Sequence, residues 1–185
     1  RFGLIGQSLN HSFSQQFFRD FFSKNDIDGT YENLEFQDIE ALKSFFNDAV
    51  YNYAGLNVTI PYKTAVIPFL DRVDDEAKKI GAVNTIKVVS GQLVGYNTDV
   101  FGFRQSIKPF LTNKHEKAMV IGTGGASKAI DFVLKKIGLE VLFISRQTND
   151  SNDIFTYEEI NNYMVDACKL VVNCTPVGSY PFTQD

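Results

Sequence analysis

The first half of the chain carries a lysine, an amide and a carboxylate in three short polar segments. Lys63 ends the polar segment 57–63, which lies at the carboxyl end of an expected strand, and Asn84 and Asp99 stand in two later segments. Ligands of open α/β sheets bind at the carboxyl ends of the strands, where a lysine can protonate a carbonyl oxygen or take a proton from an alcohol. Each residue alone has a plainer interpretation, Lys63 as a solvated charge and Asp99 as a helix cap. It is much less credible that the plain interpretation holds for every one of these residues at once. The segments together therefore favour a catalytic site.

Two serines stand at the entrance of an expected helix. Ser12 and Ser14 are separated by one residue and precede a phenylalanine-rich helical stretch, and His11 before them is interpreted as a surface or packing residue. Free N–H groups and the positive end of the helix dipole attract anions at such an entrance. The pair therefore predicts a carboxylate-binding site, with a simple N-cap by one serine as the alternative.

Glycines lie directly between an expected strand and an expected helix in the second half. Gly122, Gly124 and Gly125 permit a tight turn and a close backbone approach, and the helix offers its free N–H groups to a pyrophosphate. The spacing departs from G-x-G-x-x-G because Ser127 stands at the third position. In its strand-loop-helix-strand context, the loop predicts dinucleotide binding by residues 122–126 rather than a purely structural turn.

The end of the next strand indicates which dinucleotide is bound. NAD sites usually place a carboxylate there to hold the ribose 2′-hydroxyl. Here Ser145 and Arg146 follow the strand, and both can donate hydrogen bonds to a 2′-phosphate. NADP is therefore the predicted cofactor, with a merely solvated arginine as the alternative.

Strand and helix signals alternate along both halves. The first half predicts strands at 2–6, 30–36 and 54–59, helices from Ser14, over 38–49 with Asp38 as N-cap and near 74–80, and a hairpin of strands 82–89 and 92–96 around Ser90-Gly91. A helix capped by Thr98 or Asp99 should run to about residue 111, ahead of a polar linker at 112–116. The second half predicts strands at 117–121, 141–144 and 170–173 and helices at 126–137 and 157–164. Such alternation implies an α/β fold with parallel sheets.

Three parts are expected: an α/β domain over 1–100, a connecting helix and linker over 101–116, and a Rossmann-like doubly wound domain over 117–185. A complete doubly wound domain has two βαβαβ halves. The chain stops barely past the first half, so the second domain is expected to be incomplete and the chain to be a fragment of a longer protein.

Composition narrows the classes of partner. With 185 residues, 44% hydrophobic and 22% charged, the chain can bury a core. Its net charge of −4 and scattered Lys and Arg argue against nucleic acid and anionic membranes. Cys168 and Cys174 fit neither a CxxC pair nor half of a zinc site, and two reduced, packed thiols suit a cytoplasmic protein. No metal site and no membrane span are predicted, and a homodimer is left open as the assembly.

In order, these segments resemble the shikimate dehydrogenase family over nearly the whole chain. The matching segments are His11-Ser12-Phe-Ser14, Asn57-Val-Thr59-Ile-Pro-Tyr-Lys63, Gly81-Ala-Val-Asn84-Thr, Gly95-Tyr-Asn97-Thr-Asp99, Gly122-Thr-Gly-Gly125-Ala and Asn173-Cys-Thr175-Pro-Val-Gly178. The resemblance implies reversible reduction of 3-dehydroshikimate to shikimate by NADPH, a step toward chorismate and the aromatic amino acids. It also implies that the first domain binds the substrate.

The resemblance implies a role for each matching residue. Ser12 and Ser14 would bind the substrate carboxylate. Lys63 and Asp99 would form the catalytic pair, and the ring hydroxyls would be held by Thr59, Lys63, Asn84 and Asp99. The cofactor would be bound by Gly122, Thr123, Gly124, Gly125, Ala126, Ser145, Arg146 and Thr175.

Three departures from the family pattern are visible. Gln15 replaces a frequent proline, Ser145-Arg146-Gln147 replaces Asn-Arg-Thr, and the family's C-terminal glutamine and helices are not in this sequence. A quinate/shikimate dehydrogenase that uses NAD or accepts both substrates is a rival within the enzyme class. A catalytically silent relative that senses the same ligand is another, but retention of Lys63 and Asp99 argues against it.

Overall fold

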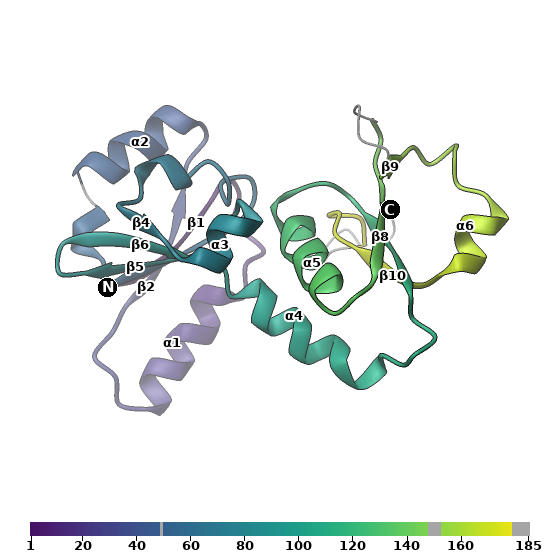
Figure 1. Cartoon of the computed structure of the whole chain (residues 1–185). Helices are drawn as coiled ribbons and strands as arrows, with labels where there is room; N and C mark the ends of the chain where they lie inside the picture. Colours follow the sequence, from purple (N-terminus) through teal and green to yellow (C-terminus); the bar gives the residue numbers. More distant parts are fainter. Residues whose placement is uncertain (49, 148–152, 179–185) are drawn as a thin grey trace. The chain divides into compact units, whose positions relative to one another are not determined.

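The computed structural model describes residues 1–48, 50–147 and 153–178, and it divides into two compact units, Arg1–Asn97 and Thr98–Asp185 (Figure 1). Each unit is built on a sheet of its own, six-stranded in the first and four-stranded in the second. The α/β fold class is therefore confirmed for both units.

The sheet of the first unit has the strand order β2-β1-β3-β5-β6-β4. Its elements are β1 Phe2–Gly6, α1 Ser14–Lys24, β2 Tyr31–Glu35, α2 Ile39–Asp48, η1 Val50–Asn52, β3 Gly55–Val58, η2 Ile67–Phe69, β4 Arg72–Val73, α3 Asp75–Ile80, β5 Thr85–Val89 and β6 Gln92–Tyr96. As expected, Asp38 caps α2, with its carboxylate accepting from the Ala41 N–H at 2.8 Å. Asp74 caps α3 in the same way.

The expectation of a parallel sheet holds only in part of this unit. β1 pairs in parallel with both β2 and β3, but β5 runs antiparallel to β3 and to β6. The antiparallel pairing of β5 with β6 follows from the hairpin at Ser90-Gly91, whose φ angles of 51° and 75° are those of a type I′ turn. The sheet is mixed, and β5 begins at Thr85 rather than at residue 82.

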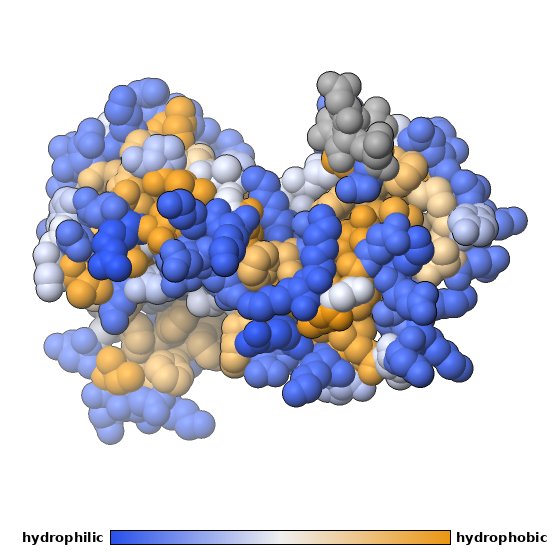
Figure 2. Space-filling view, viewed as in Figure 1, coloured by the Kyte–Doolittle hydropathy of each residue, from blue (hydrophilic) through white to orange (hydrophobic). Residues whose placement is uncertain are grey.

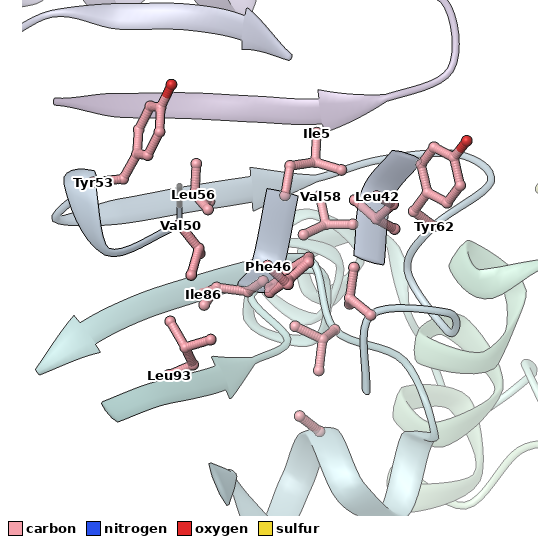
Figure 3. Packing of buried hydrophobic residues seen from close by; sticks show 13 residues of the cluster. Ile5, Leu42, Phe46, Val50, Tyr53, Leu56, Val58, Tyr62, Ile86 and Leu93 are labelled. Atoms are coloured by element: carbon pink, nitrogen blue, oxygen red, sulfur yellow. The ribbon is translucent and has the colours of Figure 1, made fainter. Parts of the chain in front are cut away.

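Helices cover both faces of this sheet, α1 on one and α2 on the other (Figure 1). The α2 face holds the larger core, whose members interlock between β1, β3, β5 and β6 (Figure 3). Ile5, Leu42, Val50 and Ile86 in this core are fully buried. A smaller cluster of Leu4, Leu9, Phe22 and Tyr31 fills the α1 face, with Phe2 and Phe18 packed against it.

The spacing of the four α1 phenylalanines at i, i+1, i+4 and i+5 predicts one apolar face, but the structure does not bury all four on one side. Phe18 and Phe22 pack toward the sheet, but Phe17 and Phe21 are 61% and 44% exposed. Neighbouring positions on a helix are about 100° apart, so a stripe two residues wide cannot all face one flat sheet. Hydrophobic side chains are accordingly visible on the surface of α1 (Figure 2).

The second unit contains α4 Asp99–Ile107, η3 Lys108–Phe110, β7 Lys117–Ile121, α5 Gly125–Lys136, β8 Glu140–Ile144, β9 Ile154–Phe155, α6 Asn162–Ala167 and β10 Cys168–Asn173. All strand pairs are parallel, in the order β10-β7-β8-β9. The order reverses between β7 and β10, because the chain moves outward from β7 to β9 and then returns to the other side of β7. This reversal is the topological switch point of a Rossmann-like sheet, where ligands bind.

The elements of this unit differ most from the expected ones at α4, α6 and β9. The α-helical part of α4 ends at Ile107, and Lys108–Phe110 is a 3-10 turn, because Pro109 cannot continue an α-helix. α6 begins at Asn162, since the Asn161 side chain caps it by accepting from the Met164 N–H at 3.1 Å. β9 is an added strand of two residues, too short to leave a pattern.

Candidate active site

Polar segments of the first unit meet at the carboxyl edge of its sheet. Thr59 follows β3 and Asn84 precedes the antiparallel β5, so both leave the sheet at the same edge. The Val58 N–H donates to the Asn84 carbonyl at 2.8 Å, and the Thr59 N–H donates to the Ile5 carbonyl at 2.8 Å. The structure thus brings together segments that lie far apart in the sequence.

Lys63 is attached to the segment that carries Asn84. Its carbonyl accepts from the Val83 N–H at 2.7 Å, and its neighbour Tyr62 is buried, with the hydroxyl donating to the Phe36 carbonyl. The Lys63 side chain is half-buried. The backbone on both sides of this lysine is therefore fixed.

Ser12 and Ser14 lie at the start of α1, as predicted. The Ser12 hydroxyl oxygen accepts from the Ser14 N–H at 3.2 Å, and Ser14 is the first helical residue. The alternative interpretation, in which one serine only caps the helix, thus holds in part for Ser12, because its hydroxyl satisfies one free N–H of the helix start. A hydroxyl oxygen has a second lone pair and a proton to offer, so this contact leaves Ser12 able to donate to a carboxylate.

A hydrogen-bonded chain of side chains crosses the α1 face of the sheet. The Tyr31 hydroxyl donates to Asn57 Oδ1 at 2.8 Å, Asn57 Nδ2 donates to Thr85 Oγ1 at 3.4 Å, and Thr85 Oγ1 donates to Asn84 Oδ1 at 3.0 Å. Burial raises the pKa of Tyr31 to about 12, although a hydrogen bond with the Ser14 hydroxyl acts in the opposite direction. The tyrosine is therefore a neutral donor at physiological pH.

Asn84 and Asn97 are two of the few buried polar residues among those described, each 8% exposed. Asn97 Nδ2 donates to the Ala82 carbonyl at 3.0 Å, which attaches the end of β6 to the segment before Asn84. Buried amides need such partners. Asn97 therefore holds the edge on which Asn84 is displayed.

Asp99 is the first residue of α4 and belongs to the second unit. Thr98 occupies the N-cap position, and its side chain makes no capping hydrogen bond to the helix. A carboxylate in the first turn interacts favourably with the helix dipole. Asp99 is half-buried.

The glycine loop lies where β7 ends and α5 begins, at the switch point. Gly122 has φ +100°, and a Cβ on it would lie 3.0 Å from Thr175 Cγ2 and 3.3 Å from the Cys174 backbone. Gly124 is the N-cap of α5, and open space surrounds the place of its missing side chain. The loop thus exposes backbone at a helix N-terminus, which suits a phosphate group.

Ser127 stands where the fingerprint has its third glycine. Its hydroxyl donates to the Gly124 carbonyl at 2.7 Å, and the residue is 1% exposed. The position needs a small residue so that helix and strand pack closely. Serine meets that need because its one polar group is satisfied inside the loop.

The other two cofactor segments follow β10 and β8. After β10, Thr175 directs its methyl group toward Gly122, and its hydroxyl donates to Asn173 Oδ1 at 2.7 Å. After β8, the Ser145 N–H donates to the Phe155 carbonyl at 2.9 Å, and Arg146 is exposed. No carboxylate stands at residues 145–147.

Six polar residues that support the proposed site residues have no role of their own in the predictions from the sequence: Tyr31, Asn57, Thr85, Asn97, Ser127 and Asn173. A buried tyrosine usually has a hydrogen-bond partner, and this was the available signal for Tyr31. The identity of that partner could not be read from a sequence, because Asn57 lies on another strand.

No cluster of three potential metal ligands is found within residues 1–48, 50–147 and 153–178. No helix in these ranges is long and apolar enough to cross a membrane. Both cysteines are free, and burial raises the pKa of each thiol, that of Cys174 to about 11.

Known proteins are similar to this chain in sequence and in fold. The model of the shikimate dehydrogenase substrate binding domain matches residues 4–86. Proteins named shikimate dehydrogenase (NADP(+)) from Methanosphaera stadtmanae and Clostridium beijerinckii are 37% and 38% identical, over 97% and 100% of this chain and 69% and 70% of their own length. A crystal structure of shikimate 5-dehydrogenase from Thermus thermophilus, in complex with NADP(H) and shikimate, is 32% identical, with a TM-score of 0.82 over 96% of this chain and 69% of that one. On this identity and coverage, the chain belongs to the shikimate dehydrogenase family.

Proposed function

We propose that this protein catalyses the reversible reduction of 3-dehydroshikimate to shikimate with NADPH, a step of chorismate and aromatic amino-acid biosynthesis. The main support for the proposal comes from two backbone hydrogen bonds at the edge of the first sheet, which join Val58 to Asn84 and Val83 to Lys63. These bonds join the backbone of the segments that carry Thr59, Lys63 and Asn84 at the end of the sheet where α/β proteins bind ligands, which supports the proposal.

For the substrate, the proposal assigns a polar side chain of the protein to each polar group of the ligand. Ser12 and Ser14 bind the carboxylate through neutral donors at the start of α1. The ring hydroxyls are held by Thr59, Lys63, Asn84 and Asp99. The hydrogen-bonded chain from Tyr31 to Asn84 supports this assignment, because it links the serine end of the site to the amide end.

Lys63 and Asp99 are the proposed catalytic pair. Lys63 gives a proton to the oxygen of the ketone during reduction and takes it back during oxidation. Asp99 is assigned to the pair because the family resemblance gives it this role. Acid-base help of this kind is worth on the order of 10² to 10⁴ in rate.

The second part of the proposal is cofactor binding. The residues of the glycine loop fit the pyrophosphate of a dinucleotide. The backbone of Gly122 to Ala126 can approach a pyrophosphate closely, since open space surrounds the place of a side chain at Gly124 and α5 presents free N–H groups. Ser145 and Arg146 offer donors to a 2′-phosphate, and Thr175 lies beside Gly122. When bound, NADPH supplies the hydride for the reduction.

Two finer points belong to the same proposal. The cytoplasm is the proposed location, because two free thiols suit a reducing compartment. The proposed partners are the small substrate and the cofactor, and the proposed assembly is a homodimer.

The experiment is a measurement of initial rates at the nicotinamide absorbance band with shikimate and NADP, on the full-length protein. We expect turnover with shikimate and NADP, and weaker turnover when NAD or quinate is substituted. Equal use of NAD would favour the quinate/shikimate rival, and ligand binding without any turnover would favour a sensor.

A further inference from the structure

Tyr31 contacts both the helix that bears Ser14 and the strand that bears Asn57. We propose that Tyr31 is a positioning residue, whose hydroxyl and ring hold the start of α1 in register with Asn57 and Asn84, and thereby set the distance between the carboxylate-binding and ring-binding groups. The inference rests on the proposed function and deepens it, since it names a residue that determines carboxylate recognition without touching the substrate.

On the helix side, three contacts fix Tyr31 to the first turns of α1. Its ring stacks on Phe18 with centroids 4.4 Å apart and planes 13° from parallel. Gln15 Nε2 donates to the Tyr31 carbonyl at 3.4 Å, and the Ser14 hydroxyl hydrogen-bonds with the Tyr31 hydroxyl. Gln15 occupies the position where related sequences often carry proline, so this chain adds a side-chain link that proline cannot make.

On the sheet side, the hydroxyl begins the chain of hydrogen bonds. It donates to Asn57 Oδ1 at 2.8 Å, and the chain continues through Thr85 to Asn84. Each member donates to the next. The orientation of the Asn57 amide is thereby assigned, and with it the roles of the Thr85 hydroxyl and the Asn84 amide.

The hydroxyl is not needed to fill the core. Tyr31 is 8% exposed within a cluster of Leu4, Leu9 and Phe22, where a phenylalanine ring would occupy the same volume. Both side chains that bond the hydroxyl, those of Ser14 and Asn57, belong to the site or support it. Its removal should therefore disturb substrate recognition more than folding, and recognition of the carboxylate most of all, because Ser14 is a direct neighbour.

The test compares Tyr31→Phe with the wild type on two substrates, shikimate and its methyl ester, which lacks the negative carboxylate. One hydrogen bond corresponds to about a threefold to tenfold change in an equilibrium. We expect KM for shikimate to rise by about that factor, with kcat within about twofold and KM for NADP unchanged. The preference for shikimate over the ester, as a ratio of kcat/KM values, should fall by a similar factor.

The ratio distinguishes positioning from a structural role, because a loss of folded protein lowers both rates equally and leaves the ratio unchanged. Tyr53→Phe is the matched control, since this buried tyrosine hydroxyl bonds Arg1 and Glu32 away from the site. It should leave the ratio at the wild-type value. An unaltered ratio in Tyr31→Phe, or a loss confined to kcat, overturns the inference.

Two further outcomes are distinguishable. Should Tyr31→Phe fail to fold, Gln15→Ala removes the other polar link between α1 and Tyr31, and an unchanged ratio in that variant overturns the inference. Should the wild type itself fail to turn over shikimate, the proposed function is wrong, whatever Tyr31 does.

Discussion

The N–H of Val83 donates to the carbonyl of Lys63 at 2.7 Å, which joins the lysine's loop to the segment that presents Asn84. The backbone of Lys63 is thus fixed by a hydrogen bond that does not involve its side chain. A substitution of this side chain should leave the loop in place, so that an effect on rate reports on chemistry.

Lys63→Ala is expected to lower kcat by about a hundredfold or more, because it removes the proposed proton donor. NADP binding, measured by fluorescence titration, should be unchanged. Lys87→Ala, which removes an exposed lysine of β5, is the control and should behave as the wild type. A variant that keeps more than about a tenth of the wild-type kcat would show that another group donates the proton.

Replacing Ser12 and Ser14 together by alanine should raise KM for shikimate by about a hundredfold or more. Each hydroxyl offers a hydrogen bond to a charged group, which is worth about 1.5–3 kcal/mol. Ser106→Ala, which removes a hydroxyl bonded within α4, should leave KM unaltered. If the double variant also keeps the wild-type KM, the serines serve only the helix start.

Arg146→Ala should weaken NADP selectively, since NAD has no 2′-phosphate for the guanidinium to bind. The ratio of kcat/KM values for NADP and NAD should fall about tenfold to a hundredfold. NAD turnover should hardly change, and Lys169→Ala, an exposed cation elsewhere in the same unit, should not alter the ratio. Equal weakening of both cofactors would show that Arg146 supports the loop or the adenine instead.

Gly122→Ala should destabilise the second unit and impair cofactor binding, whereas Gly124→Ala should be tolerated in stability. At Gly122, φ is +100° and the new methyl group would lie 3.0 Å from Thr175 Cγ2. At Gly124, φ is −77° and nothing lies within 4 Å. We expect Gly122→Ala to lose about 1–3 kcal/mol in urea unfolding, and equal stabilities of the two variants would contradict this account of the loop.

The free energy of unfolding should fall as pH rises from about 10 to about 12, partly through Tyr31. Its phenol has a pKa near 10 when unfolded and about 12 when folded, so between these values the unfolded state releases a proton that the folded state keeps. Below a pH of about 10 the contribution is fully present. Urea titrations at a pH of about 9 and about 11.5 should show a steeper decline for the wild type than for Tyr31→Phe. Parallel declines would mean that the phenol is not desolvated.

The sequence alone determined the elements that depend on neighbours along the chain. The cap of α2 by Asp38 is of this kind, and so are the hairpin at Ser90-Gly91 and the glycine turn before α5. Each depends on hydrogen bonds or φ angles within a few residues. The order of the polar segments was also sufficient to indicate the family.

The tertiary structure decided what depends on partners distant in the sequence. The antiparallel β5, the division of the α1 phenylalanines and the reversal between β7 and β10 all follow from which strand or face lies next to which. The same holds for Tyr31, because a sequence shows only that a buried hydroxyl needs a partner. That the partner is Asn57, two strands away across the sheet, is set by strand order and register, to which residues from the whole unit contribute.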